Sequence, residues 1–540
     1  MVIEVIRVPY KAVICIFATA IIGVQPTISF AQEQQNPVST ADALHAALLE
    51  RHSSFFADGA PDPLFDFYAS RNFAPAWSGS DSNGDAAADV MTALSHADMQ
   101  GLRVQDYSTT AGKWRTSPES GPDAAAFELS LTTDLMRYAA DVRLGKINPT
   151  RVYSDVDLPP GTFEFVSALN SALRRRRIEK FLADLPPQEP EYRGLVQGLE
   201  NYRQQQSQGG WTRVPGSGEV SLDGRDSRSQ ALISRLAQED PSLASSPAPS
   251  VDDVRAALTR FQARNGIHAD GRVTEATLAA LNVPIDARIA KIAVNLERWR
   301  WLQRGFEDRY VLVNVPDQTV EFIANGEILL ESRAIIGKPK SKTPIARLSA
   351  SALIIDPPWH VPEDIAASQI LPKLRQNPNY LAAKNMVLEN GPAGDPYGRT
   401  LNWRKLKAMP YLVDQNPGPD SAMGVLMLDA PNSFGVYLHD TPGKALFEAK
   451  TRDASNGCIR VERMLELSAL ILGGDTNDTT DQLRADIAAG TTQSIALNRE
   501  LPIYLLYQTA VAYQDGTVGF RSDIYGRDKP LAAALMKSAG

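Results

Sequence analysis

The sequence predicts a multidomain α+β protein, on three observations. Its 540 residues exceed what one hydrophobic core supports, so about three domains are expected. Apolar residues recur with helical spacing across residues 41–245, whereas from residue 310 onward many alternate with a period of two, as in β-strands. Between these regions, residues 241–250 are rich in Pro, Ser and Ala and have the composition of a linker.

The first 31 residues have the features of a secretory signal peptide. Arg7 and Lys11 precede an apolar run over residues 12–24, and small residues precede a cleavage site after Ala31. A helix of that run would span only about 20 Å, short of the hydrocarbon core of about 30 Å. We therefore expect residues 1–31 to be removed, with retention as an uncleaved membrane anchor as the alternative. The expected destination is the cell envelope.

Charge and cysteine content restrict the partners. Removing residues 1–31 changes the formal net charge from −8 to −9, and a chain this acidic argues against nucleic acid as a partner. Cys15 lies in the signal, so Cys458 is the only cysteine of the mature chain. A lone thiol in an exported protein is either buried and inert or kept for its reactivity.

Residues 32–245 are predicted to form a mostly α-helical scaffold domain. Helical patterns return repeatedly, for example at residues 124–142. His45, His52 and His96 have no metal-ligand spacing with cysteines or a carboxylate pair. We therefore expect no catalytic constellation in this region.

Residues 246–286 read as helix, glycine turn, loop and helix. The pattern resembles the small three-helix peptidoglycan-binding module. That resemblance implies wall binding, although a spacer that binds nothing is the alternative.

The last predicted domain, residues 292–530, begins with a helix and continues as strands. Residues 310–315 and 319–323 alternate, and Asn325-Gly326 is a strong hairpin signal. Between residues 363 and 423 the strand pattern stops, and we interpret this stretch as a helical and loop insertion that acts as a lid.

A chemical constellation follows the insertion. His439 ends an apolar run, and Cys458 follows it by 19 residues within Ser455-Asn456-Gly457-Cys458-Ile459-Arg460. An imidazole takes the thiol proton, because the thiolate is the nucleophile. Gly457 lets backbone amides approach a substrate carbonyl, and such amides stabilise a developing oxyanion. Arg460 adds positive charge near the thiol.

This stretch resembles the signature of the YkuD-type L,D-transpeptidase domain, in which a histidine precedes a Ser-His-Gly-Cys-(Ile/Val)-Arg segment by nearly twenty residues. Asn456 departs from the pattern, because the family most often has histidine there. The order of elements from residue 295 onward is also similar to that of the large Gram-negative members of the family, which have a scaffold part and a capping subdomain.

The resemblance implies a periplasmic enzyme that acts on peptidoglycan stem peptides. His439 would deprotonate Cys458, the thiolate would attack the carbonyl of the third stem residue, and the terminal D-alanine would leave. An acceptor amine would then resolve the thioester to give a 3-3 cross-link. The resemblance leaves the acceptor unspecified, and other wall-synthesis proteins are possible partners.

Supporting roles are assigned to neighbouring side chains. Asp440 is a candidate to orient His439, although it can equally point away. Ser455 is a candidate cap of the turn that exposes the thiol. Tyr437 and Trp403 are candidate substrate contacts, with a core position in the lid as the alternative for Trp403.

Two other functions stay open at this point. A cysteine peptidase or carboxypeptidase of stem peptides is one, although its common type places cysteine before histidine. A wall-binding protein with weak catalysis is the other, supported only by Asn456. Metal hydrolysis is disfavoured, because the catalytic region contains only His360 and His439 and no ligand spacing. We expect neither a metal nor a cofactor.

Overall fold

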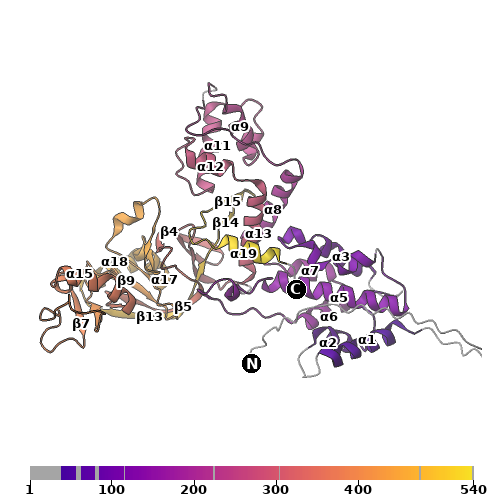
Figure 1. The fold of residues 1–540 in the computed structure, drawn as a ribbon, viewed down its shortest axis with the longest axis horizontal. Coiled ribbons are helices and arrows are strands. Elements are labelled where there is room, and N and C mark those ends of the chain that lie inside the picture. Colours follow the sequence, from indigo (N-terminus) through magenta and orange to yellow (C-terminus); the bar gives the residue numbers. More distant parts are fainter. Residues whose placement is uncertain are drawn as a thin grey trace, which may run out of the picture.

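The computed structural model describes residues 38–537 except 56–61, 79–83, 115, 223–224, 303–304 and 474–475. The predicted signal peptide, residues 1–31, lies outside the described residues. Figure 1 shows three arms that meet around one helix, α13 (Ile285–Arg300). Within the described ranges, no helix has both the length and the apolar character needed to cross a bilayer.

The first arm is a helical body with its own core. Buried residues from Leu44 to Leu185 form one hydrophobic cluster. Asp62 begins one of the helices by accepting hydrogen bonds from the amides of Leu64 and Phe65, with proline at the first helical position. The elements are α1 (Thr40–Phe55), α2 (Pro63–Ala69), α3 (Gly84–Ser95), η1 (Ala97–Gln100), η2 (Val104–Tyr107), α4 (Thr109–Lys113), α5 (Gly121–Leu144), η3 (Pro149–Arg151), α6 (Phe165–Arg174) and α7 (Ile178–Asp184).

The second arm is a small helical module that starts earlier than the sequence suggested. Its helices are α9 (Ser229–Ala237), α10 (Pro241–Ala244), α11 (Val251–Arg264) and α12 (Glu275–Leu281). Val214 and Leu243 belong to the same buried cluster as Phe261. The hydrophobic clusters therefore place the division near residue 210 and not at 245, and the expected linker at 241–250 is partly helical because Leu243 must be buried.

The three arms meet at a packed junction. Its elements are α8 (Pro190–Ser207), α13, α19 (Asp528–Met536) and the hairpin of β14 (Ala510–Ala512) and β15 (Val518–Phe520). Glu297 and Arg300 of α13 form an ion pair at 3.1 Å with both side chains fully buried. Helix α8 packs against α13 and the hairpin, so this part of the range predicted as scaffold contributes to the junction.

The third arm is built on a sheet that closes into a ring. Its strands pair in the order β5, β13, β2, β3, β4, β12, β10 and β9, and β9 pairs back with β5. Asn325 and Gly326 both have positive φ, 54° and 81°, which confirms the predicted hairpin turn. The strands are β2 (Arg309–Asn314), β3 (Thr319–Ala324), β4 (Glu327–Gly337), β5 (Ile345–Ile355), β9 (Leu426–Asp429), β10 (Leu438–His439), β11 (Asp453–Ser455), β12 (Ile459–Val461) and β13 (Gln493–Leu506).

Several elements complete this arm. Strand β1 (Val156–Asp157), from the helical part of the chain, pairs in parallel with β5. Between β10 and β11 lies η5 (Lys444–Glu448), and between β12 and β13 lie α17 (Met464–Leu472) and α18 (Thr476–Ala488). Strand β13 is long because its first half continues to pair with β5 where it faces solvent.

The insertion has a separate core and contains strands that were not predicted. Its elements are β6 (Trp359–Val361), α14 (Glu363–Ile365), the π-helical turn η4 (Ala366–Ile370), α15 (Leu371–Gln376), α16 (Tyr380–Ala383), β7 (Met386–Glu389) and β8 (Leu412–Gln415). The strands β6, β8 and β7 form a small antiparallel sheet. Strands of three or four residues are too short to reveal an alternating pattern, so the expectation of helix and loop alone was wrong.

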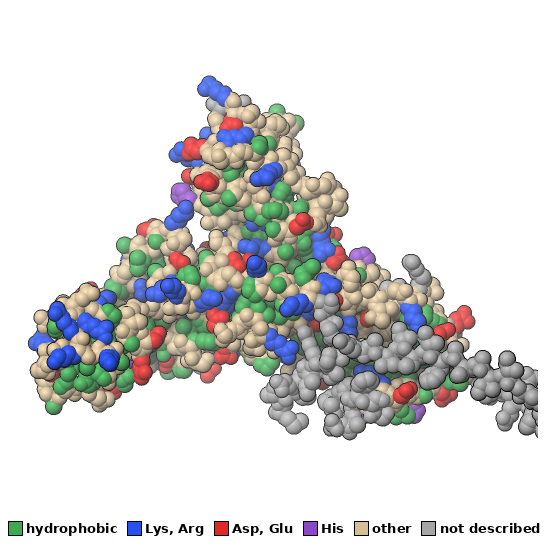
Figure 2. Space-filling model, viewed as in Figure 1, with side chains coloured by type: hydrophobic (Ala, Val, Ile, Leu, Met, Phe, Trp, Pro, Cys, Tyr) green, Lys and Arg blue, Asp and Glu red, His purple; other side chains and the backbone are tan. Residues whose placement is uncertain are grey.

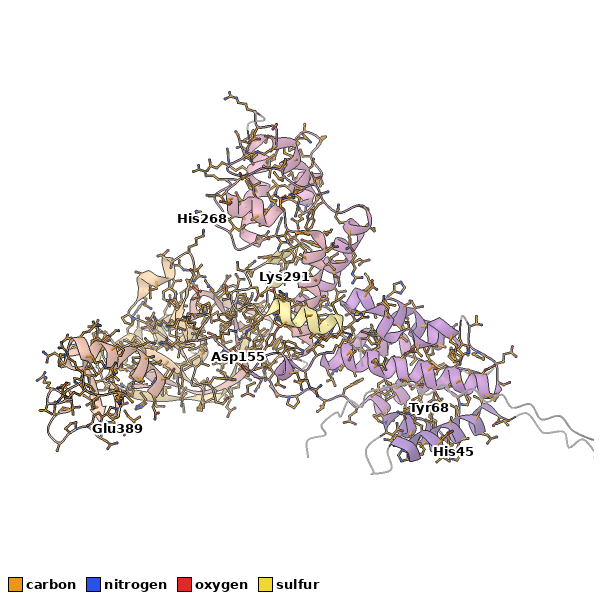
Figure 3. The ribbon with its side chains drawn as sticks, in the orientation of Figure 1. His45, Tyr68, Asp155, His268, Lys291 and Glu389 are labelled. Carbon is orange, nitrogen blue, oxygen red and sulfur yellow. The ribbon has the colours of Figure 1, made fainter. Side chains whose placement is uncertain are left out.

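Positive side chains gather on the insertion. Figure 2 shows them at the end of the molecule that carries α15 and β7. Between residues 373 and 407 the chain has two acidic residues, Glu389 (Figure 3) and Asp395, against seven basic ones. The basic residues are Lys373, Arg375, Lys384, Arg399, Arg404, Lys405 and Lys407. This end is positive on an acidic chain. Taken together, the helical arms and the β-rich arm confirm the predicted multidomain α+β class.

Candidate active site

Two neighbouring strands place the predicted catalytic residues on one face of the ring. Strands β10 and β12 run parallel, with Leu438 opposite Ile459 and His439 opposite Arg460. Leu438 and Ile459 are fully buried in the core of the ring. Because side chains alternate along a strand, Tyr437 and His439 on one strand and Cys458 and Arg460 on the other share the opposite face.

The loop before Cys458 is held by its own side chains. Ser455 Oγ accepts a hydrogen bond from Gly457 N at 3.1 Å and donates one to Cys458 O at 2.6 Å. Gly457 has φ +121°, a conformation that favours glycine. The Gly457 amide is therefore engaged within the loop and is not aimed at a substrate, while Ser455 has the predicted position within the turn.

A second support lies beneath this loop. Thr343 Oγ1 donates to Gly457 O at 2.8 Å and accepts from Gly337 N at 2.9 Å. A Cβ added to Gly337 would lie 3.0 Å from Gly457 Cα. Tyr525 OH donates to Gly337 O and accepts from Thr343 N. Gly337, Thr343 and Tyr525 thus support the nucleophile loop from below, a role that was not predicted from the sequence.

His439 is buried and neutral. Its Nδ1 lies 2.6 Å from Asp440 O and 3.2 Å from Met423 O. Both partners are acceptors, so Nδ1 must carry the proton, which leaves Nε2 as the basic nitrogen. Burial first, and then the charge of Arg460, lower the pKa of His439 to about 4.

Asp440 orients the imidazole through its main chain and not through its carboxylate. The carboxylate accepts from Lys444 Nζ at 2.5 Å and from Val425 N at 3.2 Å. The predicted side-chain role is therefore wrong, because Lys444 and Val425 N draw the carboxylate away from the ring.

Cys458 is half-buried and rests as a thiol. Burial raises the pKa of Cys458, and the amide of Tyr437, the charge of Arg460 and the amide of Cys458 itself oppose this effect. The sulfur lies 4.0 Å from Gly435 O, and within the described part of the chain no hydrogen bond joins it to His439. The amides of Tyr437 and Cys458 thus lie close enough to the sulfur to favour the thiolate.

Arg460 is a half-buried cation without a counter-ion. Its Nε is buried and makes no hydrogen bond, and no ion pair of this side chain occurs among the described residues. Burial lowers the pKa of Arg460, and the Cys458 thiolate opposes this effect. A guanidinium left unpaired beside the nucleophile is suited to bind a carboxylate of a ligand.

Asn456, the residue that departs from the family pattern, contacts the insertion. Its Oδ1 accepts a hydrogen bond from Gln369 Nε2 at 3.0 Å. Gln369 belongs to the π-helical turn η4, and such turns recur at functional sites. Gln369 thus connects the insertion to the nucleophile loop, and no motif in the sequence marks this residue.

The two predicted substrate contacts have different positions. Tyr437 is half-buried next to Cys458, and burial followed by the charge of the thiolate raises its pKa. Trp403 is only 2% exposed and belongs to the core of the insertion, packed over Gly398. Its prediction as a substrate contact is wrong, because a side chain buried there cannot reach a ligand.

A metal centre has no support in the geometry. Within the described ranges, no three His, Cys, Asp or Glu side chains are placed to share a metal ion. His360 hydrogen-bonds Asp414 at 2.8 Å on the exposed small sheet of the insertion.

Comparisons with known families agree with this geometry. Residues 308–482 match the model of the L,D-transpeptidase catalytic domain (YkuD). Residues 62–199 match a scaffold domain, and residues 250–281 match the model described as "Putative peptidoglycan binding domain". The chain therefore carries a catalytic domain of the YkuD-type L,D-transpeptidase family, and the resemblance inferred from the sequence is confirmed.

Individual relatives were also found. A curated protein of Haemophilus influenzae named "Putative L,D-transpeptidase" is 33% identical over 247 residues, which cover 45% of this chain and 49% of the relative. The chain thus spans about half the length of that relative.

Two solved structures align at low similarity. An L,D-transpeptidase from Stackebrandtia nassauensis is 13% identical and covers 55% of this chain and 96% of its own, with a TM-score of 0.20. The catalytic domain of an E. faecium L,D-transpeptidase acylated by ertapenem is 13% identical and covers 37% of this chain and 99% of its own, with a TM-score of 0.19.

Proposed function

We propose that this protein is a cysteine-dependent L,D-transpeptidase of the cell envelope that forms 3-3 cross-links between peptidoglycan stem peptides. The observation that carries the proposal is the common face of β10 and β12, which holds Cys458, His439 and Arg460 within the matched catalytic domain. The domain match supports peptidoglycan as the substrate.

Acylation begins with a neutral His439 and a protonated Cys458. His439 Nε2 takes the thiol proton as Cys458 Sγ bonds to the carbonyl carbon of the third stem residue. The amides of Tyr437 and Cys458 stabilise the resulting oxyanion. The C–N bond to the terminal D-alanine then breaks, and the imidazolium of His439 gives its proton to the departing amine.

In the transfer step, His439 again acts first as a base and then as an acid. The amine of an acceptor stem peptide attacks the thioester, loses its proton to His439, and displaces the thiol of Cys458. A peptide bond replaces the thioester, and the thiol regains the proton. No metal or cofactor takes part in this sequence.

Arg460 and the insertion position the donor. The unpaired guanidinium of Arg460 binds a carboxylate of the stem peptide. The insertion serves as a lid over the site, supported by the contact between Gln369 and Asn456 and by the seven basic against two acidic residues between residues 373 and 407. Positive charge on a lid favours the approach of an anionic stem peptide.

The proposed location is the periplasm. The motivation is the signal-like composition of residues 1–31. N-terminal sequencing of protein from the envelope tests it, because a chain that starts near residue 32 supports secretion with cleavage, whereas a chain that starts at Met1 indicates an anchored protein.

Product analysis tests the activity. The purified mature chain is mixed with a disaccharide-free stem tetrapeptide, with and without a tripeptide acceptor, and the products are identified by mass spectrometry. Release of D-alanine with a dimer of the two peptides supports transfer. Release of D-alanine with only the hydrolysed tripeptide, even with excess acceptor, would assign a carboxypeptidase instead.

A further inference from the structure

Positive and apolar side chains meet at the free end of the insertion. In Figure 1, α15 and β7 lie at the end of the third arm, far from the junction. Figure 2 shows blue and green side chains gathered over this end. We call it the tip surface, and it consists of Lys373, Arg404, Lys405, Lys407 and the apolar run at residues 408–412.

The four cations of the tip surface are exposed and have no counter-ion. Each side chain is exposed, and no ion pair joins any of the four to a residue in the described part of the chain. Lys373 Nζ donates to Tyr380 OH at 3.1 Å, and Arg404 Nε donates to Arg375 O at 3.2 Å. Both acceptors are uncharged, so all four positive charges remain available to an anionic partner.

Acidic side chains do not balance this charge. The stretch from residue 373 to residue 412 contains two, Glu389 and Asp395. Asp395 is only 9% exposed, and its carboxylate accepts hydrogen bonds from the amide and hydroxyl of Thr400 at 2.6 and 2.8 Å. Glu389, labelled in Figure 3, is exposed and pairs with Leu412 across β7 and β8. One exposed carboxylate against four cations leaves the tip surface positive.

The loop that carries two of the cations is held against α15. Arg375 donates from Nη2 to Leu406 O at 2.6 Å, and Leu406 packs against the core of the insertion around Trp403. Because Leu406 is anchored in this way, Lys405 and Lys407 on either side of it are held at the surface. The fold therefore fixes where these two charges lie.

Five consecutive apolar residues follow the lysines. They are Ala408, Met409, Pro410, Tyr411 and Leu412. None of the five is buried, and Leu412 is 43% exposed. Single exposed apolar side chains are common on proteins, but an unbroken exposed run beside unpaired cations marks an interaction surface.

The combination of the two features selects the kind of partner. A soluble anion such as a stem peptide is attracted by charge and gains nothing from an exposed leucine. A bilayer with anionic headgroups uses both features, because its phosphates pair with lysine and arginine while apolar side chains enter the boundary between headgroups and acyl chains. Long lysine side chains also reach the phosphates while their stems cover apolar surface.

We propose that the tip surface docks on a bilayer that contains anionic phospholipids, with its cations at the phosphates and its apolar run inserted shallowly. This attachment is peripheral and separate from the signal-like N-terminus. It does not rest on the proposed function, since none of the residues that dock belongs to the Cys458 face.

Docking at this end determines how the molecule is held. The third arm lies next to the bilayer, and the two helical arms extend away from it (Figure 1). An enzyme held in this way meets substrates near the membrane at a higher effective concentration than a freely diffusing one.

Vesicle sedimentation tests the proposal on the mature chain, residues 32–540, which lacks the apolar run of the signal. One set of vesicles is phosphatidylcholine alone, and the other is an equal mixture of phosphatidylcholine and phosphatidylglycerol. Lys405→Glu/Lys407→Glu reverses two charges of the tip surface. Lys113→Glu/Lys529→Glu, at exposed lysines of α4 and α19, gives the same net charge and is the matched control.

The wild-type chain and the control should bind the mixed vesicles to a similar extent and leave the phosphatidylcholine vesicles unbound. Lys405→Glu/Lys407→Glu should bind the mixed vesicles about 30-fold more weakly, because each cation near an anionic bilayer strengthens binding several-fold. An ionic strength of about 0.5 M should also weaken wild-type binding. Cys458→Ala should bind as the wild type does.

Two further variants test insertion of the apolar run. Ala408→Trp, at an exposed position, should bind the mixed vesicles about fivefold more tightly, a gain that a misfolded chain would not show. Leu412→Ser should bind about threefold more weakly. Both differences from the wild type should persist at high salt, because they do not arise from charge.

Three results would overturn the proposal. The first is a wild-type chain that does not bind the mixed vesicles, including one that binds the soluble stem tetrapeptide at the tip surface instead. The second is an equal loss of binding in the tip variant and the control, because net charge alone would then explain the attraction. The third is wild-type binding by both Ala408→Trp and Leu412→Ser, because the surface would then attract anions without entering a bilayer.

Discussion

The fully buried Glu128 and the half-buried Arg460 are two charged groups with opposite surroundings. Glu128 of the helical arm is fully buried and accepts five hydrogen bonds. They come from the amides of Ala76 (2.8 Å), Trp77 (2.7 Å) and Ser78 (2.7 Å), from Ser78 Oγ (2.8 Å) and from the hydroxyl of Tyr68 (2.9 Å), which Figure 3 labels. Burial raises the pKa of Glu128, and these donors oppose the rise.

Arg460 of the catalytic arm has no such shell. Its Nε is buried without a hydrogen bond, and its charge acts on the thiol of Cys458 and on the neutral ring of His439. Arg235 and Arg527 also have buried nitrogens without hydrogen bonds, but each of them forms an ion pair. The missing counter-ion and the position next to Cys458 together mark Arg460 as a group available to a ligand.

The largest expected effect is at the nucleophile. Cys458→Ser should lower transfer at least about 1,000-fold, because a hydroxyl keeps its proton at a pKa far above that of a thiol. In the wild-type chain, mass spectrometry after carbapenem treatment should find one adduct, on the peptide that contains Cys458. Wild-type transfer by Cys458→Ser, or an adduct on another peptide, would contradict the mechanism.

Removing the satisfied charge should damage the fold and spare the chemistry. Glu128→Gln turns an amide toward donors that need an acceptor, so the free energy of unfolding should fall by about 2–4 kcal/mol. Chemical denaturation measures it, with Glu119→Gln, an exposed carboxylate, as the control. Carbapenem acylation of the folded variant should proceed at the wild-type rate. A stable but inactive Glu128→Gln chain would contradict the purely structural role assigned to Glu128.

Removing the unpaired charge of Arg460 should spare the fold and damage the chemistry. Arg460→Met should leave the free energy of unfolding unchanged or raise it by about 1 kcal/mol, because an unpaired buried cation is lost. Transfer, measured as kcat/KM for the donor peptide, should fall about 10- to 100-fold through loss of a charge-assisted contact. A variant that unfolds more easily yet turns over normally would make Arg460 structural.

The pH profile should reveal the low pKa of His439. The folded pKa is about 4 and the unfolded value is about 6.5, so the base stays neutral down to about pH 4. Acylation by a carbapenem should change little between about pH 5 and 7 and should fall about tenfold per pH unit below the folded pKa. Arg460→Met should move this acid limb upward, because Arg460 holds the pKa of His439 down. An acid limb near pH 6.5 in the wild-type chain would contradict the buried, neutral ring.

The same ring makes stability depend on pH. Below about pH 6.5 His439 is protonated in the unfolded chain, whereas in the folded chain it stays neutral down to about pH 4. The free energy of unfolding therefore falls as the pH decreases from about 6.5 to about 4. The full difference corresponds to about 3 kcal/mol. Denaturation at pH 7 and pH 4, with a His439→Gln variant as the reference, measures this contribution.

The smallest effect concerns the contact between the insertion and the nucleophile loop. Gln369→Ala and Asn456→Ala should each lower transfer about two- to fivefold, and the double variant should lose no more than either, since both remove one hydrogen bond. Asn456→His should be tolerated. Purely additive losses would show that the two residues act separately, and an Asn456→Ala chain as inactive as Cys458→Ser would make Asn456 catalytic.

The sequence predicted what local chemistry determines. The Asn325-Gly326 turn follows from the φ preferences of two residues, and the pairing of His439 with the Cys458 segment follows from a strict interval. That His439 and Cys458 share one face of the sheet follows from the two-residue period of side chains along a strand. These features are local, so one sequence is enough to find them.

The rest depends on contacts between distant segments. Gln369 lies 87 positions from Asn456, and nothing in its neighbours marks it. The sequence left two orientations of the Asp440 side chain open, and the hydrogen bond from Lys444 determines which of them is adopted. The module boundary moved because Val214 and Leu243 are buried by helices later in the chain, which local composition cannot reveal.

The position of Tyr525 affects the order in which the active site can mature. Its hydroxyl bonds Gly337 and Thr343, which support Gly457 beneath the nucleophile. The ring itself needs β13, which ends at Leu506. A chain whose synthesis has reached Cys458 but not Tyr525 therefore lacks the residues that support the loop around the thiol, so the thiol gains its directed reactivity only when nearly all of the protein has been made.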